Sequence, residues 1–220
     1  MHCNGTQQLG SSGRKTGLWL EELAAPYFKF KEAGYKVKIT SVKGGKVPLD
    51  PRSLEEDRKG PHSKKFLESD ETKNLLNDTE SVRDVKDVYD ILYLPGGHGT
   101  MWDFTTEPVK ETVKRHYKAG KVLSSVCHGP AGFIKPEDDK GEPIVKGKKV
   151  TSFSNSEEKS IGDIDAVPFL LEDALKERGA LYQKGPDWGS FVVVDEPFVT
   201  GPNPQSAEEV GEATVKLAGK

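Results

Sequence analysis

Two apolar segments separated by a helical segment constrain the fold of this chain more than any other feature. Residues 89 to 104, YDILYLPGGHGTMWDF, begin as a nearly continuous apolar run and then break at a Pro-Gly-Gly turn. A helix is predicted over residues 106 to 119, and a second apolar run, KVLSSVC, covers residues 121 to 127. Such runs are typical of strands that are covered on both faces. A strand, a helix and a second strand in this order predict a βαβ unit with parallel pairing.

The remaining segments extend this α/β pattern over the chain. Apolar spacing predicts further helices over residues 19 to 34, 165 to 180 and 206 to 219. Strand patterns occur over residues 35 to 42 and 148 to 153, with a hairpin over residues 191 to 201. The highly charged residues 52 to 84 are interpreted as a surface insertion. With 220 residues the chain fits one domain, a layered α/β sandwich with helices on both faces of a mostly parallel sheet.

Charge and cysteine content exclude several classes of protein. The formal net charge is -3, so there is no basic excess that would indicate binding to nucleic acid or to an anionic membrane surface. No apolar run approaches the ~18 residues that span a bilayer, and the N-terminal residues lack a secretory signal. We therefore expect a soluble protein in the cytoplasm, with the nucleus as a further possibility. The two cysteines, Cys3 and Cys127, make a disulfide framework improbable, so Cys127 is expected to be a free thiol.

The segment SVCHG around Cys127 has the layout of a nucleophile elbow. Small residues, Ser125 and Gly129, flank the cysteine, although the first position of the pattern is usually glycine. Ligands of such sheets bind at the carboxyl ends of the strands, where both Cys127 and the glycine turn are expected. A thiol at a helix N-terminus is favoured as the thiolate, and the amides of Gly97 and His128 could face an oxyanion. The alternative is an inert cysteine buried at a strand end.

A histidine and a pair of acids offer partners for this cysteine. His128 is the next residue, so its imidazole must curl back to reach the sulfur, which only the bend of an elbow allows. An acceptor that orients the imidazole is available from Glu157 or Glu158 in SFSNSEEKSIG, just beyond a predicted strand. The alternative interpretation is a solvated acidic pair at the start of a helix.

Several separate motifs together resemble one known family. The segments VCHGPAGF, LYLPGGHGTMWDF, TGLWLEELAAPYFKFKEAGYKV, SVKGGKVPLDPRS and FVTGPNP are similar to those of the ThiJ/PfpI superfamily of class I glutamine amidotransferase-like proteins. Within it, the chain resembles the small heat-shock-chaperone-like branch of glutathione-independent glyoxalases, over roughly residues 9 to 205. The resemblance implies a flavodoxin-like three-layer sandwich with a nucleophile elbow.

The resemblance also implies a set of site residues. Cys127 would be the nucleophile, His128 the catalytic histidine and Glu158 the acid of the triad, with Glu157 left open as the alternative. A further glutamate, four residues before a proline, falls on Glu22. We expect Glu22 and the thiolate to share one proton, with Glu22 as its holder. Its neighbour Glu21 is then expected at the surface. Substrate would lie against Gly96, Gly97, His98 and His128, with His98 as a pocket wall.

The implied reaction is conversion of a small 2-oxoaldehyde such as methylglyoxal to D-lactate, without glutathione, cofactor or metal. A homodimer is also implied. One alternative is a stress-response holdase that binds unfolded client proteins and uses Cys127 as a redox sensor. A glutamine-type amidase fits less well, because its relatives usually draw the histidine from a distant loop.

One region departs from the family pattern. Family members generally begin with a buried first strand, whereas only MHCNGTQQ, residues 1 to 8, precedes the first loop here. We therefore expect the first strand to be truncated or missing, which would leave the neighbouring strands with unpaired edges.

Overall fold

Parallel strands form the centre of the fold, as the βαβ pattern predicts. The computed structural model describes residues 1 to 219. In it, β4 (Ile91–Leu94) pairs in parallel with β5 (Val122–Val126), and β5 pairs in parallel with β9 (Phe198–Gly201). The edge strand β8 (Val193–Asp195) runs antiparallel to β9, which confirms the predicted hairpin. The carboxyl ends of β4 and β5 therefore meet at one edge of the sheet.

Two smaller parallel sheets flank this one. The strands β1 (His2–Cys3), β2 (Thr40–Ser41) and β3 (Glu80–Ser81) pair in that order, and β1 contacts β4. On the other side, β6 (Lys149–Val150) pairs with β7 (Leu181–Tyr182) and contacts β8 and β9. The predicted α/β architecture with mostly parallel strands is confirmed.

The first strand is present but only two residues long. The amide of Thr40 donates to the carbonyl of Met1 at 2.9 Å, and the amide of Val42 donates to the carbonyl of Cys3 at 3.0 Å. Cys3 is fully buried. The expectation of a missing strand was therefore wrong in part: a short segment of residues 1 to 8 pairs with β2.

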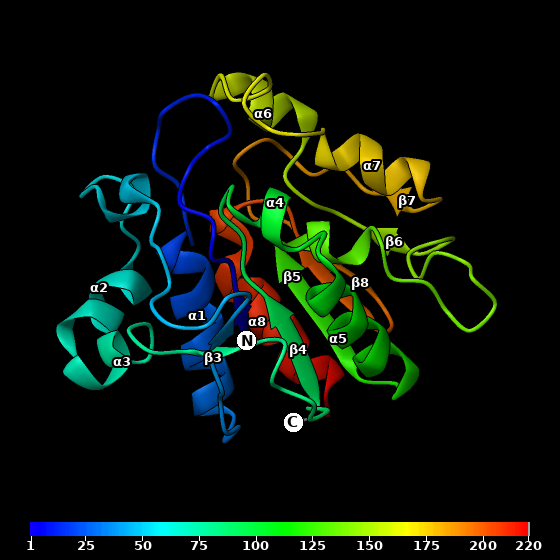
Figure 1. Cartoon of the computed structure of the whole chain (residues 1–220), viewed down its shortest axis with the longest axis horizontal. Coiled ribbons are helices and arrows are strands. Elements are labelled where there is room, and N and C mark those ends of the chain that lie inside the picture. Colours follow the sequence, from blue (N-terminus) through cyan, green and yellow to red (C-terminus); the bar gives the residue numbers. More distant parts are fainter. Residues whose placement is uncertain (220) are drawn as a thin grey trace.

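Helices cover both faces of the central sheet (Figure 1). Helix α8 (Ala207–Leu217) packs on β5 and β9, and α1 (Leu20–Glu32) packs on α8. Helix α5 (Glu107–Lys118) packs on β5 from the opposite face. The remaining helices are short: η1 (Pro51–Leu54), α2 (Pro61–Glu68), α3 (Asp70–Asn74), α4 (Thr100–Asp103), η2 (Gly129–Phe133), α6 (Asn155–Ser160), α7 (Leu171–Glu177) and η3 (Pro204–Ser206). None of the helices described in residues 1 to 219 is both long and apolar enough to cross a bilayer.

Three predicted elements are shorter in the structure. The strand predicted over residues 148 to 153 is reduced to the two residues of β6. The helix predicted over residues 165 to 180 is α7, which begins only at Leu171. Pro168 lies in the missing part, where it would remove an intrahelical hydrogen bond and clash with the preceding turn. The strand predicted over residues 35 to 42 is reduced to β2, because β1 offers it only two residues to pair with.

The charged residues 52 to 84 are not only a surface insertion, as the sequence suggested. Phe66 of α2 is fully buried, and its ring meets that of Tyr27 edge to face at 5.5 Å. Glu21, expected at the surface, is half-buried, and its carboxylate accepts the amides of His62 and Ser63 at 3.3 and 2.7 Å. These bonds cap the N-terminus of α2 and fix it to α1.

Packing of the central strand generates a stability prediction. Leu123 of β5 is fully buried, whereas Leu181 of β7 is 51% exposed. We expect Leu123→Ala to lower the free energy of unfolding by about 3 kcal/mol, because it removes buried methyl groups and leaves a cavity. The matched change Leu181→Ala is expected to cost less than about 1 kcal/mol. Urea denaturation followed by circular dichroism measures both, and equal losses would contradict the placement of β5 at the centre.

Candidate active site

The backbone at Cys127 makes the sharp turn that the elbow pattern predicts. Its φ is 60°, a left-handed conformation that costs a non-glycine residue roughly 1–3 kcal/mol. Two hydrogen bonds of 2.9 Å hold it there: the Cys127 amide donates to the carbonyl of Gly201, and its carbonyl accepts the amide of Phe153. The sheet therefore maintains the strained turn, which is followed by the short 3₁₀ helix η2.

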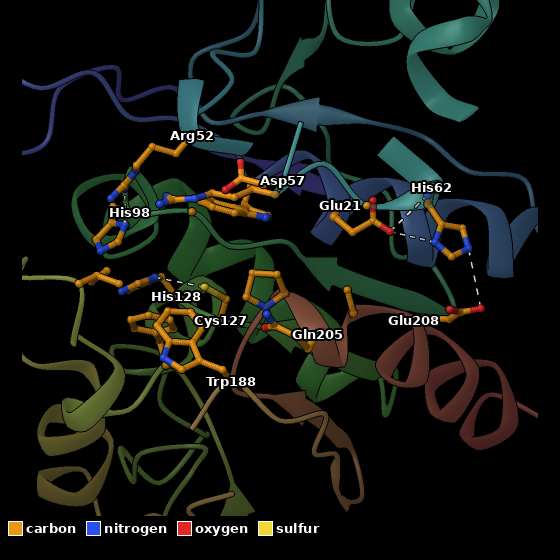
Figure 2. Close-up of a pocket in the computed structure, with 18 of the residues that line it drawn as sticks. Glu21, Arg52, Asp57, His62, His98, Cys127, His128, Trp188, Gln205 and Glu208 are labelled. Atoms are coloured by element: carbon orange, nitrogen blue, oxygen red, sulfur yellow. Dashed lines mark hydrogen bonds and ion pairs between the residues drawn. The ribbon is translucent and has the colours of Figure 1, made fainter. Parts of the chain in front are cut away.

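The turn lets His128 reach back to its neighbour. Nδ1 of His128 lies 3.3 Å from Sγ of Cys127 (Figure 2). Its Nε2 lies 2.6 Å from Oε2 of Glu158. All three residues are buried. Of the two candidate acids, Glu158 is the one that contacts the imidazole. The side chain of Glu157 instead forms a capping box with Ser154 at the start of α6.

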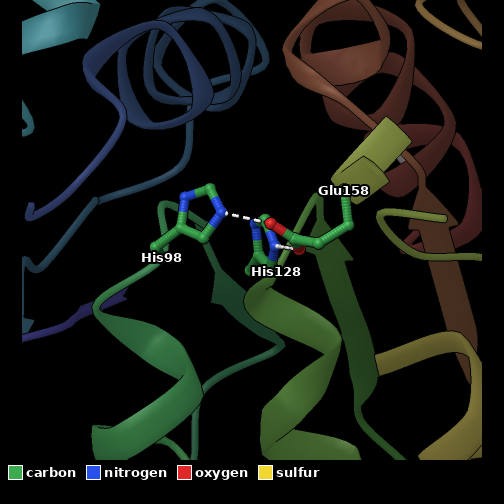
Figure 3. Close-up of side chains that lie close together, drawn as sticks. All are labelled: His98, His128 and Glu158. Atoms are coloured by element: carbon green, nitrogen blue, oxygen red, sulfur yellow. Dashed lines mark hydrogen bonds and ion pairs between the residues drawn. The ribbon is translucent and has the colours of Figure 1, made fainter. Parts of the chain in front are cut away.

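A second histidine bonds the other oxygen of Glu158. Nε2 of His98 lies 2.7 Å from Oε1, and the rings of His98 and His128 are 4.1 Å apart (Figure 3). Nδ1 of His98 is 3.2 Å from a guanidinium nitrogen of Arg52. Arginine can only donate, so Nδ1 accepts and the proton of neutral His98 sits on Nε2. His98 therefore donates to Glu158.

In this buried cluster the carboxyl of Glu158 is ionised, whereas the imidazole of His128 is neutral. Burial opposes its ionisation, but His128 and His98 outweigh burial and hold the pKa of Glu158 well below its usual range. Burial and the neighbouring His98 lower the pKa of His128, so its imidazole is neutral near pH 7. With its Nε2 proton directed at Glu158, His128 presents the lone pair of Nδ1 to the thiol. This is the arrangement of a general base.

Glu22 supplies a protonated carboxyl on the other side of the sulfur. It is fully buried, and its Oε2 accepts the amide of Gly96 at 2.8 Å. Burial raises its pKa to about 8, although the Cys127 thiol and the Gly96 amide pull it down. Near neutral pH the Glu22 carboxyl therefore holds a proton, as the sequence argument expected.

The thiol itself differs from expectation. Burial, and next the carboxyl of Glu22, raise the pKa of Cys127 well above its ordinary value, although the amide of Gly97 lowers it. The dipole argument for a resting thiolate was wrong here, because a motif does not reveal how deeply its sulfur is buried. The resting site instead combines a neutral thiol with a neutral base.

The glycine turn is required for this close packing. A Cβ at Gly96 would lie 2.6 Å from Oε2 of Glu22, and one at Gly97 would lie 2.1 Å from the carbonyl oxygen of Gly17. Gly97 also has a φ of 96°, which L-residues rarely adopt. The turn thus places the amides of both glycines against the carboxyl and the sulfur.

A pocket with a volume of about 540 Å³ opens above Cys127 (Figure 2). Three of the four residues predicted to contact substrate, Gly97, His98 and His128, line it, whereas Gly96 does not. Sequence reasoning missed its other walls, which come from distant loops and helices: Trp19, Arg52, His62, Phe153, Trp188 and Pro204. Arg52 belongs to the segment SVKGGKVPLDPRS, which contributed to the family resemblance. That motif assigned no role to Arg52.

The His98, His128 and Glu158 side chains also form a set that could ligate a metal, with ligand atoms within 4.8 Å of one another. Hydrogen bonding argues against such a site. A metal on Nε2 of His98 would move the proton to Nδ1, where it would meet the donor of Arg52. The cluster therefore fits hydrogen bonding to a carboxylate better than coordination.

This fold and this site define an α/β protein with a cysteine on an elbow, backed by a histidine and a glutamate. The chain belongs to the DJ-1/PfpI family, which it matches over residues 16–217. It is similar to Glutathione-independent glyoxalase hsp3102 of Schizosaccharomyces pombe, with 34% identity covering 92% of this chain and 89% of that protein.

Solved structures of two proteins have the same fold as this chain. The structure of glyoxalase III from Candida albicans has a TM-score of 0.89 and 30% identity, covering 98% of this chain and 95% of that one. Rapid Encystment Protein 24 kDa of Francisella tularensis has a TM-score of 0.95 and 38% identity, covering 100% and 98%. The likeness therefore extends over the whole described fold.

The buried proton of Glu22 predicts a pH dependence of stability. In the unfolded chain Glu22 ionises near its ordinary pKa of 4.5, whereas in the fold it keeps its proton up to about pH 8. Between these values the native state binds more protons, so stability falls as pH rises. We expect Glu22→Gln, whose amide stays neutral, to flatten this fall in urea denaturation from pH 5 to pH 8. The control Glu32→Gln, at the exposed end of the same helix, should keep the wild-type slope.

Proposed function

We propose that this protein is a glutathione-independent glyoxalase that converts methylglyoxal or a similar 2-oxoaldehyde to the 2-hydroxy acid, D-lactate in the case of methylglyoxal. The observation that carries the proposal is the position of the Cys127 thiol between a neutral His128 base and a protonated Glu22, at the floor of a pocket. The similarity to named glyoxalases supports the same reaction. The side chains of Cys127, His128 and Glu22 offer a nucleophile and two proton-transfer groups for this reaction.

The first step forms a hemithioacetal. As Sγ attacks the aldehyde carbon, the thiol proton moves to Nδ1 of His128, 3.3 Å away. The charge that develops on the imidazole is stabilised by Glu158, which stays ionised. The aldehyde oxygen becomes an oxyanion that the amides of Gly97 and His128 can face. It then takes the proton that His128 received from the thiol, which returns the imidazole to its neutral, basic form.

The second step transfers hydrogen between the two carbons. A base of the His128 and Glu22 pair removes the proton from the former aldehyde carbon, giving an enediol, and the pair returns a proton to the neighbouring carbon. The aldehyde carbon is thereby oxidised and the ketone carbon reduced, so the bound product is a 2-hydroxyacyl thioester. Water cleaves the thioester, which releases the acid and regenerates the thiol. Net addition of water fits a hydro-lyase of the D-lactate dehydratase type.

The holdase alternative receives less support. Large exposed apolar side chains among residues 1 to 219 are Val88, Leu181, Trp188 and Val194, which belong to different segments of the chain. Unfolded clients, a homodimer and a cytoplasmic location all stay predictions.

The nucleophile assignment gives a direct test. We expect Cys127→Ala to lower D-lactate formation from methylglyoxal by at least about a thousandfold, because no thiol remains to form the hemithioacetal. Cys3→Ala is the matched control, since Cys3 is buried in a different sheet, and it should retain turnover. D-lactate is measured with a stereospecific dehydrogenase, beside suppression of aggregation of a client protein. Full activity of Cys127→Ala would refute the assignment.

His98 gives a second test, as a positioning residue that acts through Glu158. We expect His98→Ala to move the acidic limb of the kcat/KM profile to higher pH, because Glu158, left with a single donor, would stabilise the protonated form of the His128 base more strongly. The activity should fall about tenfold. His98→Gln should restore most of both, since its amide can donate to Glu158 and accept from Arg52. An unshifted profile for His98→Ala would contradict this role.

A further inference from the structure

The loop that carries Trp188 is fixed in an unusual conformation beside the pocket. Trp188 has a φ of 61°, which is rare for a non-glycine residue and costs about 1–3 kcal/mol. The residue is 39% exposed, so its burial alone does not explain the conformation. Residues held in strained conformations tend to cluster at functional sites.

Glu157, the acid that the catalytic relay does not use, holds this loop. Its Oε1 accepts the amide of Trp188 at 3.0 Å and the side-chain amide of Asn203 at 2.8 Å. Asn203 also donates to the carbonyl of Gly189 at 2.9 Å, on the other side of Trp188. The other oxygen of Glu157 accepts the amide of Ser154 at 3.0 Å. A fully buried carboxylate thus has neutral donors on both oxygens, and it ties the tryptophan loop to α6.

The fixed indole forms one wall of the pocket. It packs edge to face against Phe153 at 5.5 Å, and Phe153 lies 4.4 Å from the ring of His128. Figure 2 shows Trp188 on one side of Cys127 and Arg52 on the other. Two aromatic rings therefore continue from the catalytic histidine to the mouth of the pocket.

On the opposite wall, Arg52 does not favour anionic substrates. The Arg52 guanidinium is bonded to Asp50 and Asp163, both fully buried, and to His98. Its charge is therefore neutralised within the protein. The pocket volume of about 540 Å³ lies in the range of sites that enclose drug-sized ligands, whereas methylglyoxal has five non-hydrogen atoms. Most of the pocket would remain empty around that substrate.

We propose that Phe153 and Trp188 form an apolar subsite for the substituent on the ketone carbon, and that the protein prefers 2-oxoaldehydes with an aromatic substituent to methylglyoxal. This inference rests on the proposed function for its substrate class. With the oxyanion against Gly97 and the sulfur on the aldehyde carbon, the rest of the substrate extends toward these two rings. Trp188 is then a specificity residue, and Glu157 is a positioning residue that acts through it.

The test compares kcat/KM for phenylglyoxal and methylglyoxal. Wild type is expected to favour phenylglyoxal by about tenfold or more, because the phenyl ring is buried against the indole. Trp188→Gly should lower this ratio about tenfold, mainly through the KM for phenylglyoxal, and it relieves the strained φ, so it should fold. The surface control Val194→Ala should leave the ratio unchanged. A wild-type preference for methylglyoxal, or an unchanged ratio in Trp188→Gly, overturns the subsite.

The role of Glu157 is tested by coupling. Glu157→Gln should also lower the ratio, and the double variant with Trp188→Gly should lower it no further than Trp188→Gly alone. Additive losses would show that Glu157 acts independently of the indole. Thermal denaturation of each variant establishes that it is folded before the ratios are compared.

A chemical probe separates failure of the subsite from failure of the proposed function. Phenacyl bromide and bromoacetone alkylate Cys127 by displacement of bromide, and each rate is divided by the rate with glutathione. The subsite predicts a phenyl preference that Trp188→Gly removes, even if no 2-oxoaldehyde is turned over. Absence of lactate with a retained alkylation preference would refute only the glyoxalase proposal and its substrate class, whereas equal normalised rates in wild type would refute the subsite.

Discussion

The strained backbone of Cys127 is the constraint on which the rest of the site depends. Hydrogen bonds to Gly201 and Phe153 keep this residue in the left-handed conformation at the end of β5. Only that turn allows the adjacent His128 to face the sulfur, and only a glycine turn at residues 96 and 97 can then approach without a clash. Backbone hydrogen bonds within the fold therefore determine where the side chains of the site lie.

Helix α6 carries two acids that do different things. Glu158 stays ionised beside two histidines, and in the proposed reaction it would stabilise the charge that develops on His128. Glu157, one residue away, has its oxygens bonded to neutral donors and determines the shape of a loop. Successive helical residues point about 100° apart, so one short helix can contact both His128 and Trp188. Helix α6 thus positions both Glu158 beside His128 and the loop that carries Trp188.

Local patterns predicted the βαβ unit, the hairpin and the elbow, because each depends on neighbouring residues. The choice between Glu157 and Glu158 could not be made from spacing, since the orientation of α6 is set by tertiary contacts. Arg52 and Trp188 were missed for a similar reason: long-range folding of loops brings them to Cys127. The pKa of the thiol was misjudged because burial outweighs the local amide dipoles.

The hydrogen bonds from α2 to Glu21 attach the charged segment to α1, while other residues of the same segment line the pocket. Residues 52 to 62 contribute Arg52 near the sulfur and His62 at the far rim, yet they attach to α1 through the Glu21 carboxylate. The neighbouring Glu22 faces inward to the thiol from the same helix. A change in this segment would therefore alter the outline of the rim and, through the bond from Arg52 to His98, the hydrogen bonding around Glu158 as well.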